Sequence, residues 1–185
     1  MDALVKEAQE KMKKSLENLG TAFGKLRSGR ANPAVLSGIS CDYYGDKMDI
    51  SLLSSITCPE PRQILIKPYS REDLKTIAAA IQAANLGLNP QVEADCIRII
   101  VPPLTEDVRK DISKQAKSLA EECKIAIRNI RRDTLDTLKK DDSMSDDYKD
   151  RVEDEVQKVV DEHIKKVDEV LASKQKEIMT VWFSH

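Results

Sequence analysis

Long helical patterns occupy both ends of this chain, and a stretch with a different pattern lies between them. Apolar residues recur every three or four positions from Leu4 to Leu26 and again from Thr105 to the C-terminus, which is the spacing of amphipathic helices. Residues 31–104 instead show short β-branched runs, turn residues and one short helical pattern. The sequence therefore predicts a two-domain α+β protein, in which a long antiparallel three-helix bundle carries a small inserted α+β domain of β/α/β type.

The predicted bundle comprises residues 1–30 and 105–185, and the predicted inserted domain comprises residues 31–104. Both connections contain residues that stiffen the backbone or restrict the residue before them. We therefore expect hinges near 30–33 and 102–105, formed by Ala31, Asn32, Pro33, Pro102, Pro103, Leu104 and Thr105.

Each helix of the bundle has a predicted start or end. The first ends at Gly29, the second begins with Thr105 as its cap, and the third begins with Ser145 as its cap. The second helix runs to about Lys139, which makes it roughly 50 Å long at 1.5 Å per residue. Its buried line is predicted to be Val108, Ile112, Ala116, Leu119, Cys123, Ala126, Ile130 and Thr134.

In the inserted domain, the sequence predicts a hairpin followed by two further strands. The hairpin strands are Val35–Tyr44 and about Lys47–Leu53, with a turn at Gly45 and Asp46. The other strands are the β-branched runs 63–67 and 97–101.

One helix is predicted between these two strands. Ser70 and Asp73 resemble a capping box, and Gly87 and Pro90 are expected to end the helix. The buried stripe of this helix is Leu74, Ile77, Ala78 and Ile81.

Composition and motifs exclude several classes of protein. A charged fraction of 34% with 41% hydrophobic residues is typical of a folded chain with exposed amphipathic helices. No run approaches the roughly 20 apolar residues that cross a bilayer, and acidic residues at Asp2, Glu7 and Glu10 do not fit a targeting segment. We therefore expect a cytoplasmic protein.

Sites for metals, cofactors or catalysis are not expected. The four cysteines are scattered without a C-x-x-C pair, which favours reduced structural thiols over a metal site. Phosphate-binding glycine loops, nucleophile elbows and zinc-protease motifs are absent from the sequence. His163 could act as a base, but its position on the apolar line of the third helix favours packing. An enzyme is therefore the weakest interpretation.

The charges are segregated along the chain. Residues 109–140 carry ten basic and five acidic side chains, whereas residues 141–185 carry seven basic and thirteen acidic ones. At about 100° per residue, five basic residues of the second helix share roughly a 100° sector, namely Arg109, Lys117, Lys124, Arg128 and Arg131, and Lys110 and Arg132 extend its edge. Such a stripe suits a protein that lies along phosphates. A solvated helix face with ion pairs is the alternative.

Five sequence motifs together resemble the bacterial ribosome recycling factor family. They occur in the family's order over the full length of the chain. They are K-L-R-S-G-R-A-N-P-A-V-L from Lys25 to Leu36, Y-Y-G from Tyr43, L-G-L-N-P from Leu86, P-P-L-T-E-D-V-R-K from Pro102 and R-N-I-R-R-D from Arg128.

The resemblance implies a non-catalytic role in translation. Members of that family enter the post-termination ribosome and place the helical domain on the large subunit near the peptidyl-transferase region. With elongation factor G and GTP they separate the subunits and release the messenger and transfer RNAs, while the smaller domain swings on the hinge. Cofactors of the chain's own are not implied, and a complete three-helix core favours a monomer.

The resemblance also suggests which residues bind ribosomal RNA. Residues matching the family's RNA-contacting arginines are Arg27, Arg30, Arg109, Arg128, Arg131 and Arg132, to which the basic sector adds Lys117 and Lys124. The end of the chain looks longer than the family pattern, and bundle packing is the expectation for Trp182 and Phe183. The competing interpretation is a non-catalytic helical module, such as a chaperone, that binds proteins through exposed stripe residues.

Overall fold

The structure is a computed structural model that describes residues 2–181, and the predicted two-domain α+β fold class is confirmed. The chain separates into two compact units. The first contains the chain up to Leu26 and Lys110–Ile178, and the second contains Arg27–Arg109 and, of the described residues, 179–181. These limits lie a few residues from the predicted ones, and residues 179–181 group with the smaller unit rather than with the bundle.

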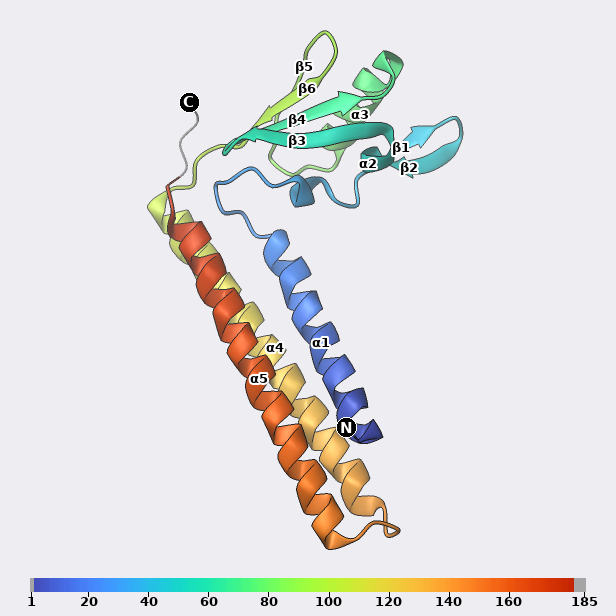
Figure 1. Ribbon diagram of the computed structural model, residues 1–185. Coiled ribbons are helices and arrows are strands. Elements are labelled where there is room, and N and C mark those ends of the chain that lie inside the picture. Colours follow the sequence, from blue (N-terminus) through green and yellow to red (C-terminus); the bar gives the residue numbers. More distant parts are fainter. Residues whose placement is uncertain (1, 182–185) are drawn as a thin grey trace. The chain divides into compact units, whose positions relative to one another are not determined.

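The first unit is a bundle of three helices, α1 (Ala3–Gly24), α4 (Glu106–Lys140) and α5 (Asp146–Met179). In Figure 1, α4 runs antiparallel to α1 and α5. With 35 residues, α4 is about 50 Å long, as predicted.

The predicted caps at both long helices are confirmed. The Thr105 hydroxyl accepts a hydrogen bond from the Val108 N–H at 3.3 Å, and the Ser145 hydroxyl accepts one from the Tyr148 N–H at 3.3 Å. Such bonds satisfy backbone donors that the first turn of a helix leaves unpaired.

The buried line of α4 differs from the prediction. Among the predicted residues Ile112, Ala116 and Cys123 are buried, whereas Val108, Leu119, Ala126, Ile130 and Thr134 are not. The line continues instead through Ala120, Ile127, Leu135 and Leu138. Leu119 and Ala126 line a groove between α4 and α1, so this side of α4 is only partly covered.

His163 is buried in α5, as the packing interpretation predicted. It is 3% exposed, and its Nδ1 lies 2.8 Å from the carbonyl oxygen of Val159. Val156 and Val167, on the same line, are fully buried. The imidazole is therefore part of the bundle core.

The first helix ends earlier than predicted. α1 stops at Gly24, because the Lys25 N–H bonds to the Ala22 carbonyl and the Leu26 N–H bonds to the Phe23 carbonyl, each three residues back. Gly29 instead adopts a φ of +76°, a left-handed conformation that glycine adopts without strain.

The second unit is built on a four-stranded antiparallel sheet of order β3-β4-β6-β5. These strands are β3 (Ser54–Glu60), β4 (Gln63–Pro68), β6 (Ile97–Ile100) and β5 (Pro90–Val92). β4 and β6 confirm the two predicted β-branched strands. β3 and β5 were not predicted, because β3 is mostly polar and exposed and β5 is a short edge strand that begins with proline.

A separate two-stranded hairpin replaces the long predicted one. It pairs β1 (Ser40–Tyr43) with β2 (Asp46–Asp49). Val35 lies in a 3-10 helix, η1 (Pro33–Leu36), because the Asn32 side chain accepts from the Ala34 N–H at 3.0 Å and proline fits the first helical position. The return strand ends early for a similar reason, since the Asp49 side chain caps a helical turn, α2 (Ile50–Leu53).

The predicted helix of the second unit is α3 (Leu74–Ala83), and its predicted stripe is fully buried. The capping box was wrong: Ser70 makes no side-chain cap bond, and a 3-10 turn, η2 (Arg71–Asp73), precedes the helix. The helix also stops before Gly87, because Asn85 already has a φ of 53°. The stripe packs on a core that includes Ile64, Ile66, Ile97 and Ile99.

Across residues 2–181, none of the helices combines the length and apolarity that a membrane span requires. Cys41, Cys96 and Cys123 are buried and Cys58 is exposed, and none of them forms a disulfide within this part of the chain. The predicted packing of Trp182 and Phe183 lies outside the described residues.

Candidate nucleic-acid interface

Two adjacent residues of α4, Cys123 and Lys124, contact different neighbouring helices, α1 and α5. The Cys123 thiol donates to the Ser15 carbonyl of α1 at 3.5 Å, and burial raises the pKa of this thiol. The Lys124 ammonium lies 2.6 Å from the Asp168 carboxylate of α5. These contacts divide α4 into a flank toward α1 and a flank toward α5.

Three arginines lie on the α5 flank of α4, and we call them the arginine cluster: Arg128, Arg131 and Arg132. At 100° per residue they lie within about 20° to 80° of Lys124 around the helix axis. Arg128 and Arg132 are exposed, whereas Arg131 is partly buried. The fold therefore brings these three predicted residues together.

Within residues 2–181, no carboxylate lies at ion-pair distance from the arginine cluster. Arg131 Nε is buried and has no hydrogen-bond partner there either. Like charges three or four positions apart on a helix repel each other. The cluster is thus a site where a bound anion would relieve repulsion, and forked guanidinium groups suit phosphate oxygens.

Unlike the arginines of the cluster, Lys124 has carboxylate partners. Besides Asp168, its ammonium lies 3.7 Å from the Glu121 carboxylate, and its side chain is only 15% exposed. The hydrogen bond to Asp168 is the main cause that raises the pKa of Lys124. This candidate is therefore already engaged between α4 and α5.

The remaining candidates lie apart from the arginine cluster along the chain. Lys117 is exposed on the same flank of α4, about 20° from Lys124 around the axis. Arg109, in the first turn of α4, is partly buried, and its Nε finds no hydrogen-bond partner within the described residues. Arg27 and Arg30 are exposed and belong to the second unit.

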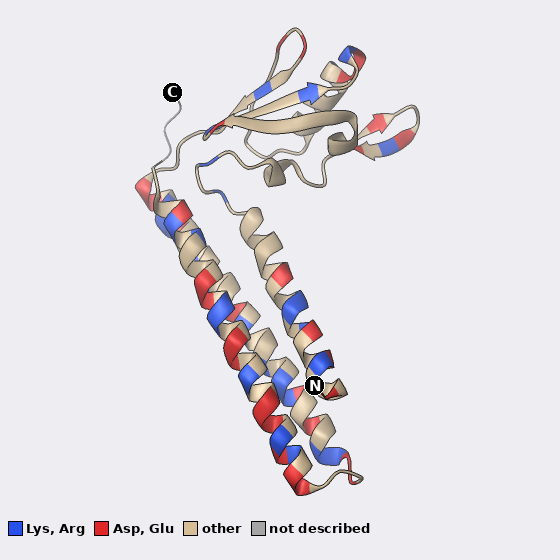
Figure 2. Ribbon diagram, viewed as in Figure 1, with Lys and Arg blue, Asp and Glu red and all other residues tan. Residues whose placement is uncertain are grey.

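The surroundings of the arginine cluster differ in charge from the facing helix. Figure 2 shows acidic and basic residues interspersed along α5, whose segment is acidic in total. On α4, the stretch from Arg128 to Arg132 holds three arginines and no acidic residue. Positive charge is therefore concentrated at this part of α4.

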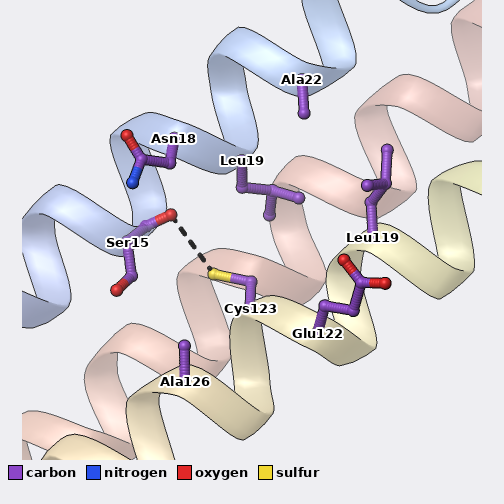
Figure 3. A pocket seen from close by; sticks show the side chains of 8 residues that line it. All are labelled: Ser15, Asn18, Leu19, Ala22, Leu119, Glu122, Cys123 and Ala126. Atoms are coloured by element: carbon purple, nitrogen blue, oxygen red, sulfur yellow. Dashed lines mark hydrogen bonds between the residues drawn. The ribbon is translucent and has the colours of Figure 1, made fainter.

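The opposite flank of α4 forms a groove with α1. Its volume is about 220 Å³, and Figure 3 shows side chains of both helices around it. Leu19 and Ala22 line it from α1, and Leu119 and Ala126 line it from α4. Basic side chains do not take part in this lining, so the groove is chemically distinct from the arginine cluster.

Sequence reasoning missed the partner of Lys124. Asp168 lies on another helix, and pairing the two requires the register between α4 and α5, which a single sequence does not contain. The like charges at 128, 131 and 132 were readable, because their spacing within one helix fixes their common flank.

The chain matches known proteins over nearly its whole length. The family model described as Ribosome recycling factor matches residues 19–179. The ribosome-recycling factor of Staphylococcus carnosus is 45% identical over 98% of this chain and 100% of the relative. Those of Caldicellulosiruptor saccharolyticus and Sorangium cellulosum are 47% and 44% identical, over 94% and 98% of this chain and 96% and 100% of the relatives.

Two solved structures share the fold. The solution structure of a ribosome recycling factor has a TM-score of 0.79 and 34% identity, with 95% of each chain covered. The second, described as the T. thermophilus ribosome recycling factor with E. coli elongation factor G bound to the E. coli post-termination complex, has a TM-score of 0.66 and 41% identity over 96% of this chain and 97% of that one. With a matching family model and relatives of this similarity, the chain belongs to the ribosome recycling factor family.

Proposed function

We propose that this protein binds the post-termination ribosome through RNA of the large subunit. Together with elongation factor G and GTP, it promotes separation of the subunits and release of the messenger and transfer RNAs. The family is one of non-catalytic translation factors, so the chain needs no reaction centre for this role. The cytoplasm is the expected location.

The arginine cluster is the observation that carries the proposal. Arg128, Arg131 and Arg132 share one flank of α4 and have no carboxylate partner within residues 2–181. A solvated face stabilised by ion pairs, the alternative explanation, fits Lys124 but not these arginines. Folded RNA presents rows of phosphates, and a helix that carries several forked cations can contact them without reading bases.

The other predicted contacts have weaker structural support. Arg27, Arg30, Arg109 and Lys117 remain candidates, since each is at least partly exposed. Lys124 would have to leave Asp168 before it could reach a phosphate, so we rank it last.

The two-unit organisation supports a mechanical role. The bundle carries the arginine cluster, and the smaller unit is joined to the bundle by two connections. One of the structural neighbours is a ribosome recycling factor described with elongation factor G bound to the post-termination complex, and we propose the same partner here. In this account the factor acts as a monomer.

The decisive experiment is subunit splitting from purified post-termination complexes. We expect splitting only when this protein, elongation factor G and GTP are all present, because the protein itself supplies no energy source. Splitting that does not depend on the protein, or that proceeds equally without elongation factor G, would contradict the proposal.

A further inference from the structure

Two aspartates of α5 occupy equivalent positions opposite basic residues of α4. The two helices are antiparallel (Figure 1), and the Lys124 ammonium of α4 lies 2.6 Å from the Asp168 carboxylate of α5. Seven residues further along α4 is Arg131, and seven residues back along α5 is Asp161. A step of seven residues changes the direction of a side chain around the helix axis by only about 20°. Asp161 therefore has the position relative to Arg131 that Asp168 has relative to Lys124.

One of these two pairs forms an ion pair and the other does not. Lys124 is bound to Asp168, whereas Arg131 has no carboxylate partner within residues 2–181, and its Nε has no hydrogen-bond partner there. Arginine is the longer side chain and carries five donors against the three of lysine. The reach of the basic side chain therefore does not explain why the second pair is not formed.

The two aspartates differ in the residue that lies four positions before each of them. Before Asp161 is Gln157, whose Nε2 donates a hydrogen bond to the Asp161 Oδ1 at 2.9 Å. Before Asp168 is Ile164, whose side chain has no donor. Residues four apart are neighbours on the surface of a helix. The Gln157 amide therefore holds the Asp161 carboxylate along α5, and no such bond holds Asp168.

An ion pair between Arg131 and Asp161 would oppose the binding of an anion. The carboxylate would occupy the guanidinium donors, and it would have to leave before a phosphate oxygen could accept from them. It would also cancel one of the three positive charges of the arginine cluster. The hydrogen bond within α5 thus leaves Arg131 available to an external partner.

We propose that Gln157 is a positioning residue that keeps the Asp161 carboxylate away from Arg131 and so preserves Arg131 for a phosphate of RNA. The consequence for RNA binding rests on the proposed function. The competition between Gln157 and Arg131 for one carboxylate is a property of the free protein and does not rest on it.

The first test uses the free protein with Gln157→Met, which keeps an unbranched side chain of similar length and removes the amide donor without changing the net charge. A crystal structure of this variant should show the Arg131 guanidinium within about 4 Å of the Asp161 carboxylate, the distance of an ion pair. A carboxylate that stays away from Arg131 in the variant would overturn the proposal.

Melting temperatures measure the same pairing in solution. In the wild-type background, the shifts caused by Arg131→Ala and Asp161→Asn should add, because the two side chains do not interact. In the Gln157→Met background they should not add, because either change removes the same ion pair. Shifts that add in both backgrounds would contradict the pairing.

Sedimentation with ribosomes tests the consequence for RNA binding. Gln157→Met should bind about two- to five-fold more weakly, which is the effect that an exposed ion pair can exert on a competing ligand. Adding Asp161→Asn to this variant should restore the wild-type affinity, and a merely structural role of Gln157 would not give this rescue. Gln9→Met, the same exchange at a partly exposed glutamine of α1, is the control and should bind normally.

The outcomes separate this proposal from the proposed function. Normal ribosome binding by Gln157→Met, or a weakened binding that Asp161→Asn does not restore, would overturn the positioning role. If the wild-type protein itself fails to bind ribosomes, the proposed function fails. The crystal structure and the melting temperatures then still decide whether Gln157 withholds Asp161 from Arg131.

Discussion

At the scale of single residues, Arg131 differs from its neighbours. Its side chain is partly buried, and its Nε is shielded from solvent without a partner within residues 2–181. Packing of the stem restricts the side chain before any ligand arrives. A guanidinium that is already held in place loses less conformational entropy on binding than an exposed one. We therefore expect Arg131 to contribute more to RNA binding than Arg128 or Arg132.

Arg131→Ala should weaken ribosome binding by about 1–3 kcal/mol, the range for a lost charged hydrogen bond. Sedimentation with ribosomes measures the affinity, and circular dichroism should show an unchanged helix content. Lys13→Ala is the control, since Lys13 is exposed on α1 and its loss removes the same formal charge. Equal affinities of the Arg131 and Lys13 variants would contradict this role.

The same variant also tests packing. Because the Arg131 stem is partly buried, Arg131→Ala could lower stability as well as affinity. Arg128→Ala removes an exposed arginine with little packing and should weaken binding without changing the melting temperature. Loss of affinity only in variants that also lose stability would assign the effect to the fold.

At the scale of elements, the core of the bundle is set by small differences in helix rotation. Ile127 is fully buried on α4, whereas Ile125, two positions away, is 53% exposed. Helical geometry places these two residues about 160° apart. Because both residues are isoleucines on the same helix, the same substitution at each changes helix propensity equally. Any difference between the two variants therefore reports burial.

Ile127→Ala should lower the free energy of unfolding by about 2–5 kcal/mol, because it opens a cavity in the core. Ile125→Ala should change it by no more than about 0.5 kcal/mol. Urea unfolding followed by circular dichroism measures both. Similar losses for the two variants would contradict the burial of Ile127 and the exposure of Ile125.

The carboxylate of Glu93 bonds to two residues at the turn between β5 and β6, which is also closed by a backbone bond from the Glu93 N–H to the Cys96 carbonyl. Glu93 bonds to the Arg98 guanidinium at 2.9 Å and accepts from the Cys96 thiol at 3.2 Å. These bonds, that to Arg98 first, lower the pKa of Glu93. A lowered folded-state pKa means that the stabilisation is present above the unfolded pKa and disappears as pH falls through the folded one.

Glu93→Gln should therefore be less stable than the wild-type protein near neutral pH. The difference should shrink as the pH falls below about 4.3, the usual pKa of a glutamate. Thermal unfolding of both proteins from pH 7 to pH 3 measures it, with a carbon NMR titration of the Glu93 carboxyl as the direct check. A stability difference that does not vary with pH would rule out this ion pair as the cause.

Local signals in the sequence predicted the elements whose causes are local. Thr105 and Ser145 could be recognised as caps, because a hydroxyl before an acidic first turn needs no distant partner. The strand predicted at Val35 was wrong although the cause was also local, since Asn32 and Pro33 start a 3-10 helix there. Turn chemistry overrides β-propensity at this position.

The features that the sequence did not predict depend on how helices and strands that are distant in the sequence pack against each other. The partial exposure of Leu119 and Ala126 follows from the groove between α4 and α1, and the Lys124–Asp168 ion pair follows from the register of α4 against α5. Similarly, nothing near Arg62 in the sequence indicates Val101 as its partner, because the sheet brings them together. Of the candidate site, the common flank of the arginine cluster was predictable and the engagement of Lys124 was not.

At the scale of the whole molecule, a near-neutral chain presents concentrated positive charge at one part of one helix. The formal net charge of −2 does not favour binding to a polyanion, so affinity for RNA must come from local charge. Each phosphate that a cation neutralises releases condensed counterions, and salt therefore opposes binding in proportion to the number of contacts.

The most direct test of this account is the affinity for ribosomes measured over a range of salt concentrations. The wild-type protein should show a linear fall of log affinity with log salt. The triple variant Arg128→Ala, Arg131→Ala, Arg132→Ala should show a slope shallower by about 2 to 3, at nearly one unit per lost phosphate contact. Lys13→Ala should keep the wild-type slope. A wild-type affinity that does not respond to salt, or a triple variant with the wild-type slope, would contradict the claim that the arginine cluster binds ribosomal RNA.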